Sequence, residues 1–126
     1  MEGLQNVLND FLKAFSRLDL EGMMVFFEDD ATSFFPSSHH IVMLDGKEEI
    51  KDAFEKVISK IHAAGHRSIK LDPEDVKTQL FGDTAIVTFH IRDNDLSRRT
   101  LVLRRNADGW FIQHLHASNA PLGETQ

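Results

Sequence analysis

The sequence predicts an α+β fold in which N-terminal helices cover one face of a curved antiparallel sheet. Apolar residues recur at helical spacing in the first half of the 126-residue chain, up to Gly65. From residue 67 onward, apolar and polar residues alternate at the period of a β-strand. Two turn sequences, Gly82-Asp83 and residues 106–109 (NADG), separate the expected strands. Helices followed by strands, in a chain of this length, indicate one domain.

Three segments carry the helical pattern. The first places its apolar side chains along one stripe, and Asp19 is suited to cap the second. In the third, Asp45 and Glu48 form a capping-box pattern, and Gly65 stands where a helix-terminating glycine belongs. The expected helices cover residues 4–18, 20–30 and 45–65.

The remaining segments read as strands separated by turns. Pro36 is expected to end the first strand, and Asp72-Pro73 to interrupt the sheet with a kink or bulge. The folded domain is expected to span residues 1–118, followed by a loose tail over residues 119–126. The expected strands cover residues 31–36, 39–44, 67–71, 76–81, 84–92, 98–105 and 110–118.

Composition limits the possible functions. The chain has no cysteine, which excludes disulfides and thiolate chemistry, and its net charge is −6. Basic residues are scattered rather than clustered, so we expect no nucleic-acid partner. No apolar run approaches the roughly 20 residues that span a membrane, and the N-terminus lacks the pattern of a signal peptide. We therefore expect a cytoplasmic protein with no membrane partner.

Three blocks of the sequence resemble the nuclear transport factor 2-like superfamily in its SnoaL-like branch. Residues 19–36 (DLEGMMVFFEDDATSFFP) resemble its helix–helix–strand entry, and residues 44–54 (LDGKEEIKDAF) its third helix. Residues 98–121 (RRTLVLRRNADGWFIQHLHASNAP) resemble its closing hairpin and the association domain of calcium/calmodulin-dependent protein kinase II. The resemblance implies a cone-shaped, strongly bent sheet of cystatin-like type. Its concave face would hold an apolar pocket beneath the helices, and its convex face would form dimers or larger rings.

Strand alternation assigns side chains to the two faces of the late strands. The more apolar sets are placed inside, which puts Phe111, Gln113, Leu115 and Ala117 of the last strand against the helices. The predicted pocket consists of Phe11, Phe35, Phe89, Arg99, Leu101, Gln113 and Leu115. The opposite, mixed face suits a contact between subunits, and its predicted residues are His90, Trp110, Ile112, His114 and His116.

The histidine pair admits a second interpretation. His114 and His116 share one face of a strand and are within reach of one metal ion, with His90 as a third ligand from a neighbouring strand. Residues 116–121 (HASNAP) offer no carboxylate beside the pair, so we favour the interface and expect neither a metal nor another cofactor.

Catalysis of the ketosteroid isomerase type is not expected. The resemblance aligns the catalytic aspartate of that enzyme with Phe35 and its tyrosine with Phe11, and neither phenylalanine can transfer a proton. It also aligns a pocket arginine of the kinase association domain with Ala117, which removes that anion contact.

Two hypotheses for function follow. The first is a non-catalytic, self-associating domain that binds a small and perhaps anionic organic molecule; Arg99, a cation beside apolar residues, would seek a carboxylate from this ligand or from the chain. The second is an isomerase, cyclase, dehydratase or hydrolase for a small hydrophobic substrate, with His40 or His90 as acid or base. A third and weaker hypothesis is a metal-dependent oxidoreductase that uses the histidine face.

Overall fold

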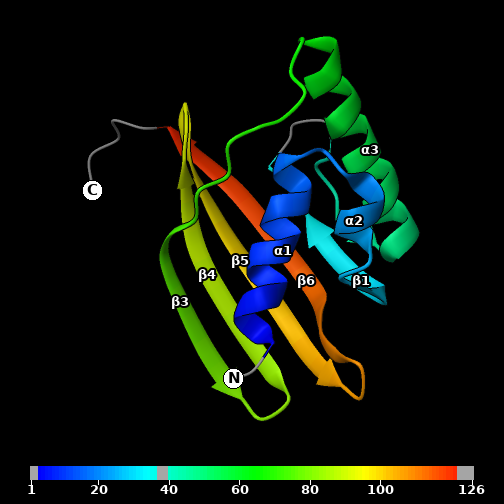
Figure 1. The fold of residues 1–126 in the computed structure, drawn as a ribbon, viewed down its shortest axis with the longest axis vertical. Coiled ribbons are helices and arrows are strands. Elements are labelled where there is room, and N and C mark those ends of the chain that lie inside the picture. Colours follow the sequence, from blue (N-terminus) through cyan, green and yellow to red (C-terminus); the bar gives the residue numbers. More distant parts are fainter. Residues whose placement is uncertain (1–2, 37–39, 122–126) are drawn as a thin grey trace.

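A computed structural model describes residues 3–36 and 40–121 and confirms the α+β class. Helices come first, and the long strands follow as one sheet that bends around α1 (Figure 1). The helices are α1 (Leu4–Ser16), α2 (Leu20–Met24) and α3 (Lys47–Ala63). The strands are β1 (Phe27–Phe34), β2 (Leu44–Asp45), β3 (Glu74–Phe81), β4 (Thr84–Arg92), β5 (Asp95–Asn106) and β6 (Gly109–Pro121).

The six-stranded sheet has the order β2-β1-β6-β5-β4-β3. Strands β3 to β6 form the predicted antiparallel meander, whereas β1 lies parallel to β6. The sequence pattern did not predict this parallel pair. Ser33 is buried at the junction and donates its hydroxyl to the carbonyl oxygen of Leu115 at 2.7 Å, which gives the buried hydroxyl a partner.

The core lies between α1, α3 and the concave face of the sheet. The apolar stripe of α1 is buried as predicted, through Leu4, Leu8, Phe11, Leu12 and Phe15. The Phe11 ring is 1% exposed and meets the Phe27 ring edge-on at a centroid distance of 5.6 Å. Phenylalanine rings pack in this way without needing a hydrogen-bond partner, which is compatible with a chain that has ten Phe and no Tyr.

Two early segments differ from the prediction. The second helix ends at Met24, because Ile112 donates its backbone N–H to the carbonyl oxygen of Phe26 at 2.7 Å and draws the following residues into the sheet. The strand expected over residues 39–44 is reduced to Leu44–Asp45; Ile41 is 82% exposed, and residue 39 lies outside the described residues.

Two later segments also differ. Residues 67–71 do not pair with a strand; instead Ile69 donates its backbone N–H to the carbonyl oxygen of Ser16, at the end of α1. The predicted loose tail is wrong for residues 119–121, because β6 continues through them and Pro121 stands opposite Asp95 of β5.

Helix α3 has the predicted end but a different start. Its N-cap is Gly46, and Glu49 rather than Glu48 accepts the backbone N–H of Asp45, at 2.9 Å. Gly65 follows the helix with a φ of 92°, a left-handed conformation that glycine adopts without steric cost.

A register shift in β6 corrects the predicted faces of that strand. Val102 stands opposite His114, yet the next residue of β5, Leu103, stands opposite Ile112, so Gln113 is an extra residue. The alternation therefore reverses at Gln113. Trp110 and Ile112, predicted to lie on the outer face, are 5% and 0% exposed in the core.

The bulge leads to a test of this assignment. Replacing Ile112 with Ala should lower the free energy of unfolding by about 2–5 kcal/mol, because it leaves a cavity in the core. Val25→Ala, at a side chain that is 59% exposed, should change it by less than about 0.5 kcal/mol. Urea denaturation measures both variants, and equal small effects would place Ile112 outside the core.

Candidate ligand cavity

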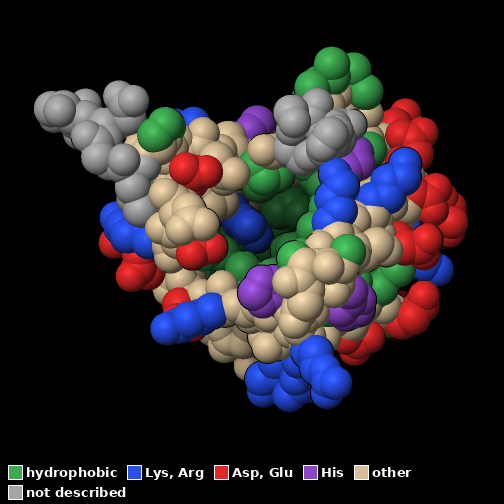
Figure 2. Space-filling view, turned by 90° about the horizontal axis from the view of Figure 1, so that it is seen from above, with side chains coloured by type: hydrophobic (Ala, Val, Ile, Leu, Met, Phe, Trp, Pro, Cys, Tyr) green, Lys and Arg blue, Asp and Glu red, His purple; other side chains and the backbone are tan. Residues whose placement is uncertain are grey.

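A cavity of about 360 Å³ opens at the end of the sheet where α1 finishes and α3 passes above β6. Figure 2 views the molecule from this end and shows a hollow with mainly hydrophobic walls and a Lys or Arg side chain inside it. Its lining residues are Phe15, Phe35, Pro36, His40, Phe54, Lys56, Val57, Lys60, Ile61, Arg99, Leu115, Ala117 and Asn119.

Aromatic rings from three separate segments of the chain form one wall of the cavity. Phe54 of α3 lies 4.6 Å from Phe35, which follows β1, and 5.3 Å from Phe15 of α1, measured between ring centroids. Phe15 and Phe54 are buried by the helical periodicity of their own helices. The wall therefore depends on the packing of α1 against α3.

Arg99 brings a positive charge to this apolar wall. It lies on the inner face of β5, its Nε donates to the Ser97 hydroxyl at 3.0 Å, and its Cζ is 5.9 Å from the centre of the Phe15 ring. Burial lowers the pKa of Arg99 to about 10, so the guanidinium stays charged at neutral pH.

Among the described residues, no acidic side chain in the cavity balances this charge. Neither an aspartate nor a glutamate is among the lining residues, and within residues 3–36 and 40–121 no carboxylate forms an ion pair with Arg99. Two further cations, Lys56 and Lys60 of α3, line the same cavity. Three cations without an acid are notable in a chain whose net charge is −6.

His40 supplies an imidazole to the cavity. Its half-buried ring lies 5.5 Å from the Phe35 ring, between centroids, in an edge-on arrangement. It is the one histidine among the described residues that line the cavity, and imidazole is the side chain best suited to acid–base chemistry near neutral pH.

Some residues of this cavity were in the predicted pocket and others were not. Of the predicted pocket, the structure brings together Phe35, Arg99 and Leu115. The residues contributed by α3 were missed, although their helical spacing marks one face of that helix. The other predicted pocket residues, Phe11, Phe89, Leu101 and Gln113, do not line the cavity.

Those four residues lie elsewhere for two reasons. Phe11, Phe89 and Leu101 are buried deep in the core, between the sheet and the helices. Gln113 turns away at the bulge, and its Nε2 donates to Asp30 Oδ1 at 3.1 Å.

The sequence of residues 4–123 matches the family of SnoaL-like domains. The chain belongs to this family.

Several solved structures have a fold similar to that of this chain. A proposed dehydratase of the nuclear transport factor 2-like family from Streptomyces avermitilis is 22% identical, with 94% of each chain covered and a TM-score of 0.80. The calcium/calmodulin-dependent protein kinase II hub from S. rosetta is 25% identical over 93% of this chain and 94% of that one, with a TM-score of 0.70. A ketosteroid isomerase-like protein from Erwinia carotovora atroseptica is 18% identical over 94% and 95%, with a TM-score of 0.72. Among curated proteins, none matches this SnoaL-like chain in sequence.

The outer face of the SnoaL-like sheet carries the histidine pair. His114 and His116 point away from the cavity, as predicted, and the Phe34 ring of β1 lies 5.9 and 5.4 Å from their rings. His114 Nδ1 is 2.8 Å from Thr32 Oγ1. Burial and the neighbouring His116 lower the pKa of His114, so this imidazole is neutral at pH 7.

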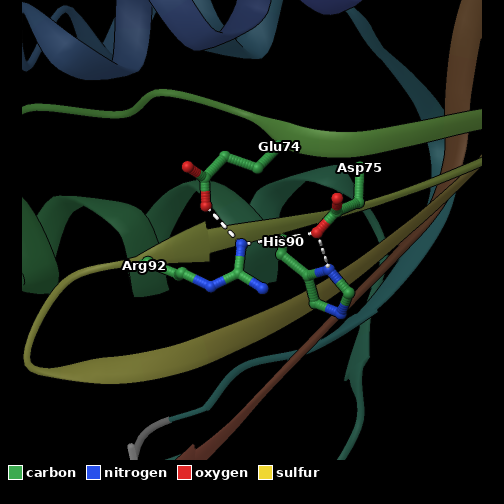
Figure 3. Close-up of polar contacts among 4 residues, drawn as sticks. All are labelled: Glu74, Asp75, His90 and Arg92. Atoms are coloured by element: carbon green, nitrogen blue, oxygen red, sulfur yellow. Dashed lines mark hydrogen bonds and ion pairs between the residues drawn. The ribbon is translucent and has the colours of Figure 1, made fainter.

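Trp110 and Ile112 must be removed from the predicted interface, because both side chains lie in the core on the other side of the sheet. His90 does lie on the outer face, where its Nδ1 is 2.8 Å from Asp75 Oδ2. Figure 3 shows this pair beside Arg92, which contacts both Glu74 and Asp75. The hydrogen bonds from His90 and Arg92 lower the pKa of Asp75.

The described residues contain neither a metal-binding cluster nor a membrane-spanning helix. Nowhere in them do three His, Asp or Glu side chains gather closely enough to hold a metal ion. Nor does any helix in that part of the chain have the length and apolar character needed to cross a membrane.

Proposed function

We propose that this SnoaL-like domain binds a small organic acid, with its carboxylate at Arg99 and its apolar body against the phenylalanine wall. The observation that carries the proposal is a charged guanidinium in an apolar cavity, with no Asp or Glu among the described residues that line it. A charge held out of water is costly unless an opposite charge meets it, and a carboxylate from a ligand would supply that charge.

The donors of Arg99 support this ligand class. Its Nε is used by Ser97, whereas its two terminal nitrogens donate to no side chain or backbone group of the described residues. Those two nitrogens match the spacing of the two oxygens of a carboxylate, which a guanidinium binds with paired hydrogen bonds.

The proposal is tested with a matched acid and alcohol. Hydrocinnamate should raise the melting temperature, and hydrocinnamyl alcohol, which lacks the charge, should raise it far less. At a hundredfold excess over Kd, the acid should stabilise the fold by about 2.7 kcal/mol. Differential scanning fluorimetry measures the shift.

The matched variants are Arg99→Met and Arg98→Met. Arg98 is adjacent in sequence but exposed, and it does not line the cavity. The shift should vanish in Arg99→Met and persist in Arg98→Met. An undiminished shift in Arg99→Met would show that Arg99 does not bind the acid.

A catalytic role is a second candidate, favoured by His40. Its imidazole lines the same cavity as Arg99, so an acid held by the guanidinium would present its carbon chain to a possible base. The structural likeness to a proposed dehydratase is compatible with this role. If His40 removes a proton from carbon, trans-styrylacetate should exchange hydrogen for deuterium in D₂O, followed by NMR, and His40→Gln should stop the exchange. No exchange above the protein-free rate would leave binding alone.

Self-association through the outer face is the third part of the proposal. Phe34 is 37% exposed and packs against His114 and His116, which forms a mixed aromatic patch suited to a partner subunit. The structural likeness to a kinase hub supports assembly of this kind.

The patch predicts a pH-dependent oligomer. Because the pKa of His114 is lowered, its neutral form is favoured in the fold, and protonation below about pH 6.5 should weaken the interface by placing charge in it. Light scattering should show the oligomer dissociating as the pH falls from about 7.5 to about 5.5. Phe34→Glu should give a monomer at neutral pH, whereas Val25→Glu, outside the patch, should not. An oligomer that survives Phe34→Glu would place the interface elsewhere.

A further inference from the structure

We propose that the ligand of the cavity is a dicarboxylate with an apolar spacer, which binds one carboxylate at Arg99 and the second at Lys56 and Lys60. This inference rests on the proposed function, because it presupposes that Arg99 binds a carboxylate. It adds a second charged group to the ligand and names the residues that select for it.

The three cations lie at two different depths in the cavity. Arg99 is half-buried on the floor formed by β5, whereas Lys56 and Lys60 are exposed on α3. The two lysines are four residues apart and so lie on the same face of the helix, one turn from each other. A ligand that reaches from Arg99 to this face has its charges at its two ends.

The lysines have no acidic partner of their own. Asp52 lies one turn before Lys56, where a helical ion pair often forms, yet neither Lys56 nor Lys60 makes an ion pair with any described residue. Lys51 provides the contrast on the same helix, because its Nζ lies 3.1 Å from Glu21 Oε1. Lys47, at the first turn of α3, also makes no ion pair with a described residue but does not line the cavity, whereas Lys56 and Lys60 do.

The surface between the two charged ends is apolar. Phe54, Val57, Ile61 and Leu115 line it, and no Asp or Glu of the described chain interrupts it. A polymethylene or aryl spacer suits such a surface, since each methylene removed from water contributes favourably to binding. A second carboxylate would remain near water at the lysines, where its desolvation costs little and its attraction to two cations is retained.

The experiment compares suberate with its monomethyl ester by isothermal titration calorimetry. The two share one carbon skeleton and differ by one negative charge. Suberate should bind the native protein about three- to tenfold more tightly, because the second carboxylate gains two exposed ionic contacts. Added salt should reduce this ratio, since exposed charges are screened.

Three variants test the contributions of the two lysines and of Arg99 separately. In Lys56→Gln/Lys60→Gln the ratio should fall to about one while the monoester still binds, whereas Lys13→Gln/Lys77→Gln removes the same charge elsewhere and should leave the ratio unchanged. In Arg99→Met both ligands should lose affinity.

The results that would overturn the dicarboxylate inference differ from those that would overturn the carboxylate site at Arg99. Equal binding of the two ligands to the native protein, or an unchanged ratio in Lys56→Gln/Lys60→Gln, would overturn the dicarboxylate inference and leave the carboxylate site at Arg99 standing. Full affinity of both ligands in Arg99→Met, or binding of neither suberate nor hydrocinnamate to the native protein, would overturn both.

Discussion

The register shift at Gln113 in β6 is the constraint on which the interior of this domain depends. Strand β6 pairs with β1 on one side and with β5 on the other, so its alternation decides what both neighbours can pack against. Before the bulge, Trp110 and Ile112 face α1; after it, Leu115 and Ala117 face the cavity. Without the extra residue, one of these pairs would face outward, and the concave side would lose either its core or its pocket wall.

The same inner face brings Arg99 into the cavity. Its neighbour Ser97 holds the Nε, and Phe15 lies beneath the guanidinium, yet neither contact supplies a negative charge. A fold of marginal stability retains a half-buried charge without a counter-charge at a cost, which is the usual condition of a binding site rather than of a structural core. The proposed acid-binding function follows from this imbalance, whereas the SnoaL-like family establishes the fold.

Much of the fold could be predicted because local signals agreed with it. The stripe of α1, the strand over residues 84–92 and the turn at residues 106–109 all depend on spacing that tertiary contacts did not override. The faces of β6 could be predicted only after the bulge. In the segment WFIQHLHA both alternations contain apolar residues, so spacing alone could not reveal that Gln113 is extra.

The cavity was only partly predictable for a different reason. Whether an apolar residue of α3 fills the core or lines a hollow depends on how far the helix stands from the sheet, and that distance is a tertiary property. Phe54 and Val57 belong to one helical stripe, and no feature of the sequence distinguishes the wall of a pocket from a packed interior. Arg99 could be identified because an arginine within an alternating apolar strand is a local anomaly.

Within residues 3–36 and 40–121, no carboxylate neutralises the charge of Arg99. Urea denaturation of the ligand-free Arg99→Met variant beside the native protein measures what this unbalanced charge costs the fold. The variant should be more stable, by about 1–3 kcal/mol, because an apolar side chain replaces a partly desolvated charge. A loss of stability would mean that the guanidinium is satisfied within the fold and needs no acid from a ligand.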